Sequence, residues 1–430
     1  SRGPGTAAIC VESAWAGRPG QRNQANMPKL GPRILLLGGD ADHNVGDRAI
    51  ASALSQCIAS HDPSAEVSIV ASHSVGPPIR GVARMIPRGT SGVAGLCRAA
   101  VAADRVLVAG GGLFQDDDSR AKMPYWAARI SLLKSLNPRI AGHSIGAGPL
   151  RHAESRAAAR LACAALTTIS VRDRFAQAAL AACTSRSIDV VPDPAFMLEP
   201  APRADAVDLL RSLDLQPGRP LIVVAARRWF HSRGGFIPNV VKARTGIGVA
   251  RDERRFELLL DVLVDGLTHL ARRLEAAVLL LPSYNVAHEG DDVVCEALAR
   301  RLRDVTVRMA RIADPRLYKA VMAHAALIIS SRMHPLILGA GMGVPLVGLS
   351  YNDKFRGLFD QLGMSTGLLP LDDFPERWGA RELIAAAEAA LVGGDDLQHR
   401  AELLGTAVQR RTLEVAFADM RERTPEVVDA

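Results

Sequence analysis

Aromatic residues are scarce in this chain of 430 residues, at 4% of the sequence, although hydrophobic residues make up 48%. The cores must therefore be built from aliphatic side chains, which suits layered α/β packing. No basic stripe studded with aromatic residues is present to stack nucleic-acid bases, so we expect no nucleic-acid partner. A carbohydrate-binding protein without enzymatic activity is also disfavoured, because few rings are available as platforms for sugars.

Paired cysteines and long apolar runs are missing as well. No run of about 18 apolar residues exists to span a bilayer. Residues 1–30 lack the apolar core of a secretory signal, and we expect them to form a disordered extension outside the fold. Single cysteines without a Cys-x-x-Cys pair are typical of reduced, buried thiols in a cytoplasmic protein, not of a disulfide frame or a zinc site. The six are Cys10, Cys57, Cys97, Cys163, Cys183 and Cys295.

The net charge of +7 and the pI near 9.3 favour anionic partners such as sugar phosphates, nucleotides or an acidic membrane surface. The arginines are scattered through helical stretches and do not form a tail. A solvated basic surface is the simplest interpretation of this distribution.

From Pro32 onward, short β-like runs alternate with amphipathic helical stretches, which predicts parallel sheets with crossover helices. We expect an α/β fold of two doubly wound Rossmann-like domains, residues 31–198 and 221–378, facing each other across a cleft. A proline-rich linker with one short helix (199–220) joins them, and helices in 379–430 follow. The expected strands are Arg33–Gly38, Val67–Ala71, Arg105–Ala109, Arg139–Ser144, Thr168–Val171 and Asp189–Val191, then Leu221–Ala226, Ala277–Leu281, Val305–Arg308, Ala326–Ser330 and Pro345–Leu349.

Ligands of open parallel sheets lie beyond the carboxyl ends of the strands, so the loops there carry the functional information. The loop GGDADHNVGDRAI follows the first strand and offers Asn44 and Asp47 at a helix expected to start near Asp47. It contains neither Gly-x-Gly-x-x-Gly nor a Walker sequence. A nicotinamide cofactor and an ATP-phosphate cradle are therefore disfavoured.

A second loop, AGGGLFQDDDSR, places Gly111 and Gly112 before three adjacent carboxylates, Asp116, Asp117 and Asp118. Such carboxylates can bind Mg²⁺ or cap the next helix, but adjacent acids on a loop are commonly solvated, so no metal is predicted. A third loop carries Arg172 and Asp173, which form either a structural ion pair or a ligand clamp.

The stretch from Ile328 to Gly348 is the most informative part of the chain. In an extended segment Arg332 and His334 face the same side, and Pro335 suits the first turn of a helix predicted over Leu336–Gly341. A cation, an imidazole and a helix N-terminus together make an anion site; the alternative is a surface ion pair and a helix-capping histidine. Arg227 would add a second guanidinium if its strand neighbours that of Arg332.

The loops in series resemble a known family. Seven segments between about Arg33 and Leu362 occur in the order typical of polysaccharide pyruvyl transferases. They are NVGDRAI, AGGGLFQDD, SIGAGPL, SVRDRF, VVPDPAF, VVAARRW and SSRMHPLILGAGMGVPLVGLSYNDK. The Arg-x-His segment with the following Ser-Tyr-x-x-Lys is the most specific part. The resemblance implies a GT-B-like fold and transfer of the enolpyruvyl group of phosphoenolpyruvate onto two hydroxyls of a sugar or glycan acceptor, free or lipid-linked. Phosphoenolpyruvate is the donor substrate, and no cofactor is implied.

By this resemblance Arg332 and Arg227 match arginines that hold phosphoenolpyruvate, and His334 matches the histidine beside them. Bidentate guanidiniums suit a ligand that carries a phosphate and a carboxylate. The remaining matched positions are assigned to the acceptor side with less specific roles: Asn44, Asp47, Gly111, Gly112, Asp116, Arg172, Asp173, Tyr351 and Lys354.

His334 is the best candidate for the general acid, and Asp116, Asp117 or Asp47 for the base that accepts a hydroxyl proton. The positive end of a helix disfavours imidazolium, so His334 should donate efficiently only once the ligand's negative charge offsets that field.

Three further expectations concern substrate and location. The basic segment from Phe230 to Arg251 is a long loop that can reshape the acceptor side. A GT-B glycosyltransferase using a nucleotide sugar, with Asp353 on the ribose, is the alternative function, but it leaves the pair Arg332 and His334 unexplained. A lipid-linked acceptor would bring this cytoplasmic chain into peripheral contact with the inner membrane face, although no amphipathic anchor is evident.

Overall fold

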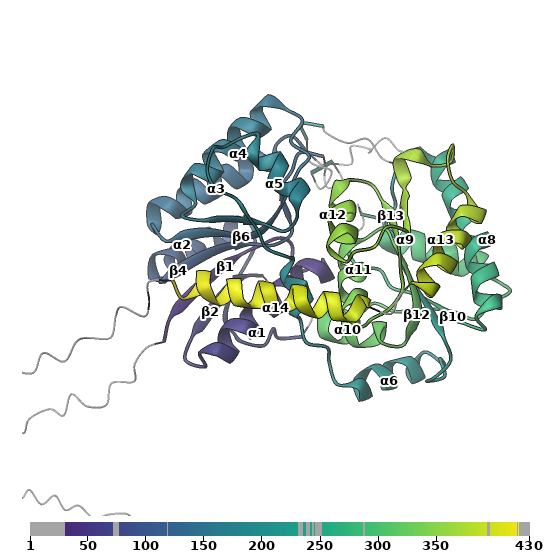
Figure 1. The fold of residues 1–430 in the computed structure, drawn as a ribbon. Coiled ribbons are helices and arrows are strands. Elements are labelled where there is room, and N and C mark those ends of the chain that lie inside the picture. The colour runs from purple at the N-terminus through teal and green to yellow at the C-terminus, as the bar shows by residue number, and fades with distance from the viewer. Residues whose placement is uncertain are drawn as a thin grey trace, which may run out of the picture.

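The computed structural model describes residues 31–71, 77–117, 119–230, 235–237, 241–242, 245, 252–286, 289–393, 396–418 and 420. The predicted extension 1–30 lies outside these residues, as does most of the basic segment after Phe230. Two parallel sheets with alternating helices form two domains, which confirms the predicted fold class (Figure 1). Within the described chain, no helix combines the length and the apolar character needed to cross a membrane.

The N-terminal sheet has the strand order β3-β2-β1-β4-β6-β7-β8, with β5 paired to β6. The order runs outward in both directions from the neighbours β1 and β4, so the loops that follow these two strands diverge and leave a ligand site between them. The strands are β1 (Arg33–Leu37), β2 (Glu66–Val70), β3 (Val82–Ile86), β4 (Arg105–Ala109), β5 (Gly112–Phe114), β6 (Ile140–Ala147), β7 (Ile169–Val171) and β8 (Asp189–Val190).

Helices cover both faces of this sheet because alternate residues of its strands point to opposite sides. Leu35 and Leu37 of β1 join one core with four helices, whereas Ile34 and Leu36 join the other core with α1 (Val45–His61). The four helices of the first face are α2 (Val93–Ala102), α3 (Lys122–Leu136), α4 (Ala153–Ala165) and α5 (Arg174–Ala181), and the short η2 (Thr90–Gly92) precedes α2.

The C-terminal sheet has the order β11-β10-β9-β12-β13-β14, in which β9 pairs with both β10 and β12. The strands are β9 (Leu221–Ala225), β10 (Ala277–Leu280), β11 (Val307–Met309), β12 (Ala325–Ser330), β13 (Leu346–Ser350) and β14 (Leu368–Pro370). The helices are α8 (Glu253–Arg273), α9 (Asp291–Arg301), α10 (Pro315–Met322), α11 (Met333–Ala340), α12 (Asp353–Gln361) and α13 (Ala380–Val392), with η4 (Leu371–Asp373).

Two connections join the domains. The predicted linker contains α6 (Arg203–Ser212), preceded by η3 (Pro194–Met197). The last helix, α14 (Leu397–Ala416), returns to the N-terminal domain and lies across both domains in Figure 1. There Thr412 meets His143 of β6 at 2.9 Å, and Arg411 pairs with Asp189 at 2.6 Å.

The predicted strands are confirmed with ends that differ by at most three residues, and three strands were not predicted. The edge strand β3 is largely exposed, and β5 and β14 have three residues each, so neither gives a periodic signal. The predicted strand Arg139–Ser144 extends to Ala147, because β5 pairs with that end of β6.

Candidate functional site

Arg227 and Arg332 come together at the carboxyl edge of the C-terminal sheet. Arg227 follows β9 and Arg332 follows the neighbouring β12. Arg227 Nη2 lies 2.7 Å and Arg332 Nη2 2.9 Å from the same oxygen, Glu289 Oε2. The sequence left their meeting dependent on strand order, and the pairing of β9 with β12 meets that condition.

A second carboxylate holds Arg332. Asp291, the first residue of α9, is fully buried and accepts from Arg332 Nε at 3.1 Å and from Arg332 Nη2. The backbone N–H groups of Ser283 and Tyr284 also donate to Asp291 Oδ2. Burial alone would lower the pKa of Arg332, but Asp291 and Glu289 outweigh it and raise the pKa. Arg332 is therefore a fixed cation.

Aromatic rings surround the two guanidiniums. Arg227 Cζ lies 4.9 Å from the ring centroid of Trp229 and 5.1 Å from that of Tyr351, and Lys354 Nζ lies 4.6 Å from the Tyr351 ring. Burial acts to raise the pKa of Tyr351, but Lys354, Arg227 and Arg332 lower it overall. Tyr351 and Lys354 were assigned to the acceptor side. The structure places both beside Arg227 in the C-terminal domain, and their substrate role stays a prediction.

The structure corrects the local conformation around His334. Helix α11 begins at Met333, not Leu336, and Arg332 is its N-cap residue with an extended backbone. Arg332 and His334 are consequently not on one side of an extended segment. The Arg332 side chain turns to Glu289 and Asp291 of its own domain, whereas His334 turns to the N-terminal domain.

His334 packs against the start of α1. A Cβ on Gly46 would lie 1.9 Å from His334 Nδ1, so only glycine allows this approach. His334 Nε2 lies 3.7 Å from Asp193 Oδ2 and, among the described residues, has no hydrogen-bond partner. Burial lowers the pKa of His334, while Asp193 and Asp47 act in the opposite direction. The imidazole is therefore neutral at pH 7.

The loop after β1 supplies Asn44 and Asp47. Asn44 caps α1, because its Oδ1 accepts from the backbone N–H groups of Gly46 at 2.9 Å and Asp47 at 3.4 Å. The helix thus starts at Val45, two residues before the predicted start. Asp47 Oδ2 accepts from the N–H of Asp40 at 2.8 Å. A Cβ on Gly111, whose φ is +64°, would lie 2.7 Å from Asp47 Oδ1, so glycine is required there.

The acidic loop after β5 buries Asp116 and Asp117. Asp116 Oδ2 accepts from the N–H of His152 at 2.9 Å, but Asp116 Oδ1 has no partner in the part of the chain that the structure describes. Asn352 Nδ2 of the C-terminal domain donates to Asp117 Oδ2 at 3.5 Å. Asp118 lies outside the described residues. The described residues contain no cluster of three or more His, Cys, Asp or Glu side chains suited to a metal ion.

Arg172 and Asp173 form a structural pair. Arg172 Nη1 lies 3.3 Å from Asp193 Oδ2, and Arg172 Nε lies 3.6 Å from Asp173 Oδ2. Asp173 caps α5 by accepting from the N–H of Ala176 at 2.8 Å. The ion-pair alternative therefore describes both residues better than the ligand clamp. Arg172 orients Asp193, which faces His334.

Sequence reasoning missed four residues of this site: Asp193, Tyr284, Glu289 and Asp291. Tyr284 links the domains, since its hydroxyl donates to Asp40 Oδ2 at 3.0 Å. The signals were present: Asp193 lies in VVPDPAF, and the others lie in SYNVAHEGDD, an acidic run at a helix start directly after a strand. We name the whole arrangement between the domains the interdomain site.

The basic segment after Phe230 reaches the N-terminal domain where it is described. The N–H of Arg120 donates to Gly235 O at 3.1 Å, and Ser119 Oγ donates to Phe236 O at 3.3 Å. These contacts cover the start of α3 beside the acidic loop. The expectation that the segment reshapes the acceptor side stays a prediction.

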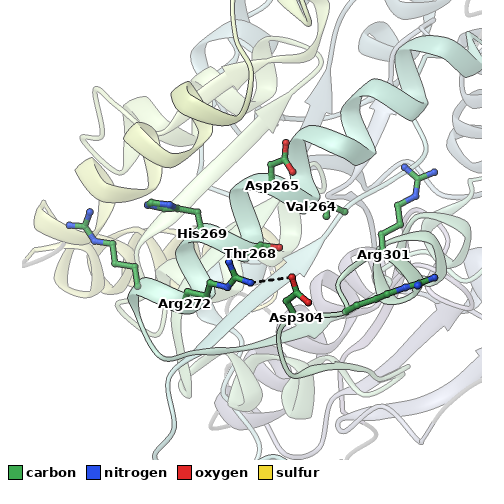
Figure 2. Close-up of a pocket in the computed structure, with 9 residues that line it drawn as sticks. Val264, Asp265, Thr268, His269, Arg272, Arg301 and Asp304 are labelled. Carbon is green, nitrogen blue, oxygen red and sulfur yellow. Dashed lines mark hydrogen bonds and ion pairs between the residues drawn. The ribbon is translucent and has the colours of Figure 1, made fainter.

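Figure 2 shows a different pocket, of about 810 Å³, on the C-terminal domain. Its lining residues precede β10 and β11, so it lies at the amino edge of the sheet, opposite Arg227 and Arg332. Three of its four arginines pair with acids: Arg272 with Asp304 at 3.1 Å, Arg301 with Asp261 at 2.9 Å, and Arg273 with Glu388. This pocket therefore does not concentrate positive charge for an anion.

Comparison with known proteins agrees with this geometry. A family model described as polysaccharide pyruvyl transferase matches residues 44–353. Similar solved structures include a UDP-N-acetylglucosamine 2-epimerase (12% identity, TM-score 0.54, covering 92% of this chain and 98% of that one). A putative UDP-N-acetylglucosamine 2-epimerase from Listeria monocytogenes has 14% identity and a TM-score of 0.52, covering 91% of this chain and 97% of that one. UDP-GlcNAc 2-epimerase from Neisseria meningitidis bound to UDP-GlcNAc has 10% identity and a TM-score of 0.50, covering 89% of this chain and 99% of that one. These identities show the fold alone, which is GT-B. No curated protein matches the chain in sequence.

Proposed function

The chain belongs to the polysaccharide pyruvyl transferase family, and from that premise we propose that it transfers the enolpyruvyl group of phosphoenolpyruvate to two hydroxyls of one sugar in a glycan. The observation that carries the proposal is the buried pair Arg227 and Arg332, which already bind one shared carboxylate oxygen. Two adjacent guanidiniums suit a donor that has a phosphate and a carboxylate on one carbon.

The donor has to displace Glu289. Glu289 and Asp291 together neutralise Arg227 and Arg332 in this structure, so an additional anion gains little while both carboxylates remain. Asp291 is fully buried and held by two backbone N–H groups, whereas the Glu289 side chain is 15% exposed. We therefore assign Glu289 as the carboxylate that leaves and Asp291 as the one that stays.

The reaction balances without a redox partner. One proton adds to the methylene carbon of phosphoenolpyruvate, and a sugar hydroxyl forms a C–O bond to the carbon that bears phosphate. The C–O bond to phosphate then breaks, and the second hydroxyl closes the cyclic ketal. Of the two hydroxyl protons released, one replaces the proton that was donated and the other leaves with phosphate.

Under this proposal His334 donates the first proton. It is neutral in the free protein, and the negative charge of the bound donor raises its pKa so that it takes up a proton. Asp116 is the proposed base, because it is buried and its Oδ1 is left without a partner among the described residues. The two groups come from opposite domains, so both are available only when the domains are together.

The alternative, a glycosyltransferase that uses a nucleotide sugar, loses its ribose-binding candidate. Asp353 has a side chain that is 69% exposed and lies 3.9 Å from Arg356 on the surface of α12. The fold is shared with nucleotide-sugar enzymes, but a shared fold hosts many functions. We therefore keep pyruvyl transfer as the proposal.

Thermal unfolding tests the proposal, because a ligand that binds only the folded protein raises its Tm. We expect phosphoenolpyruvate to raise the Tm of the wild type and of Arg356→Gln, a control in which an exposed arginine is removed. The Tm shift should disappear in Arg227→Gln. A Tm shift with a UDP-sugar and none with phosphoenolpyruvate would overturn the proposal in favour of glycosyl transfer.

A further inference from the structure

The outer helices of the N-terminal domain have an unbalanced charge. Helices α2, α3 and α4 contain one acidic residue, Glu154, and it pairs with Arg120. Helix α8 of the C-terminal domain, in contrast, has as many acids as arginines. The basic residues of the three helices are Arg98, Lys122, Arg129, Lys134, Arg156 and Arg160.

Four of these bases are available to an external partner. Within the described chain, no carboxylate pairs with Arg98, Lys134, Arg156 or Arg160. Lys134 and Arg160 donate to backbone carbonyls, at 2.9 Å and 3.1 Å, which orients them without neutralising their charge. The positive charge of these four residues is therefore uncompensated within the described chain.

Apolar side chains project between the bases. Tyr125 and Leu132 lie seven residues apart on α3 and so form one stripe, and they are 55% and 45% exposed. Leu161 of α4 is 63% exposed, and Val93 and Val101 of α2 are 48% and 64% exposed. Large exposed apolar residues that gather on one surface indicate an interaction site.

The three helices make one continuous surface. Helix α3 packs against both α2 and α4, and all three cover the same face of the N-terminal sheet (Figure 1). We call this surface the α2–α4 face. The edge of this face adjoins the interdomain site for two reasons. Helix α3 follows the acidic loop, and His152, which directly precedes α4, donates its backbone N–H to Asp116.

We propose that the α2–α4 face docks on an anionic phospholipid membrane. Uncompensated bases are attracted to acidic headgroups, and exposed apolar side chains between them enter the boundary between headgroups and acyl chains. Docking in this way places the acidic loop, the proposed acceptor side, next to the membrane. A sugar acceptor carried on a lipid would then reach the site without leaving the bilayer.

Three other occupants fit less well. A soluble polyanion would gain nothing from Leu132, Leu161 or Val101. A second copy of the chain would bring equal positive charges together. Nucleic acid would need aromatic platforms, and Tyr125 is the one exposed aromatic side chain described on these helices. The single-helix patterns of the sequence did not reveal this face, because it combines three helices.

Co-sedimentation with vesicles tests the proposal on the full chain. We expect binding to vesicles of equimolar phosphatidylcholine and phosphatidylglycerol, little binding to pure phosphatidylcholine, and weaker binding as salt increases. The triple variant Arg98→Glu, Lys134→Glu and Arg160→Glu should lower the partition coefficient by about tenfold or more. Leu132→Ser with Leu161→Ser should lower it by about three- to tenfold.

A matched control reverses three exposed arginines elsewhere, Arg377→Glu, Arg381→Glu and Arg410→Glu, and should keep most of the binding. An equal loss of vesicle binding in the control and in the α2–α4 triple variant would overturn the proposal, since net charge alone would then explain the binding. Unchanged binding of the serine variant, with equal binding to heparin, would overturn it in favour of a soluble polyanion. The Tm shift with phosphoenolpyruvate should be the same in all variants, which separates this test from that of the proposed function.

Discussion

The two sides of the interdomain site differ in charge. The C-terminal side presents the cations Arg227, Arg332 and Lys354, and two of them are held by carboxylates of the same domain. The N-terminal side presents the carboxylates Asp47, Asp116 and Asp193 together with glycine backbone. Cations suit an anionic donor and carboxylates suit hydroxyl deprotonation, so under the proposed function the donor and the acceptor bind to opposite domains. His334 belongs to the first side and contacts the second.

The largest expected effect comes from removing the fixed cation of the donor side. Arg332→Gln should lower kcat/KM for phosphoenolpyruvate by about 10³-fold or more, because one of the two guanidiniums is lost from a desolvated site. It should also lower the free energy of unfolding by about 3–5 kcal/mol, since the buried Asp291 loses its partner. Steady-state kinetics and denaturant titration measure the two effects.

A double variant separates these two effects. Arg332→Gln with Asp291→Asn removes both buried charges, so most of the stability should return while donor binding stays absent. Recovery of phosphoenolpyruvate binding in the double variant would show that Arg332 acts only through stability.

The second-largest effect is expected at His334, which contacts both sides of the interdomain site. His334→Gln should reduce kcat by about 10²-fold or more and leave KM for phosphoenolpyruvate within a few-fold, because proton transfer is lost while the arginines remain. Single-turnover phosphate release measures this step. A large rise in KM with unchanged kcat would instead make His334 a binding residue.

On the acceptor side, Asp116→Asn should lower kcat by about 10- to 100-fold without changing the affinity for phosphoenolpyruvate. The amide oxygen can still accept from the His152 N–H, so the loop should keep its fold. Asp189→Asn, an exposed acid of the same domain, is the control. Full turnover by Asp116→Asn would remove this residue from the mechanism.

A smaller effect, of opposite sign, is expected at the carboxylate that the donor displaces. Glu289→Gln should tighten phosphoenolpyruvate binding by about tenfold, because a neutral amide competes less for Arg227 and Arg332. Calorimetric titration measures the dissociation constant. Weaker binding in this variant would make Glu289 a support of the arginines and contradict the displacement.

The smallest expected effect is the uptake of a fraction of a proton when phosphoenolpyruvate binds. The pKa of His334 is lowered in the free protein, and a bound anion raises it, so phosphoenolpyruvate binding near pH 6.5 should be accompanied by proton uptake. The uptake should fall as pH rises and the imidazole stays neutral in both states. Calorimetry in two buffers of different ionisation enthalpy measures it, and His334→Gln should take up fewer protons than the wild type, because only the phosphate of the donor then titrates.

Much of the fold could be predicted from the sequence, because buried parallel strands leave short continuous apolar runs and crossover helices leave a 3.6-residue period. The start of α11 could not. The first four N–H groups of a helix have no intrahelical partner, so a proline is tolerated at several positions of the first turn, and Pro335 is the third residue of α11. Its presence therefore does not fix where the helix begins.

The contacts between residues of the interdomain site were harder to predict than the residues themselves. Arg227 and Arg332 were found by their places after strands, but their meeting depended on β9 lying beside β12. Glu289 and Asp193 act through contacts made only in the folded chain, which their sequence neighbours do not reveal. The same holds for Tyr351, whose place beside Arg227 comes from packing of Trp229 and Tyr351 at 4.2 Å.

A crystal structure with phosphoenolpyruvate bound tests the central claim most directly, namely that Arg227 and Arg332 exchange an internal carboxylate for the donor. We expect the donor's anionic groups between the two guanidiniums, Glu289 turned away from them, Asp291 still paired with Arg332, and His334 near the methylene carbon. Density for the donor at another place, with Glu289 still bound to both arginines, would contradict the claim.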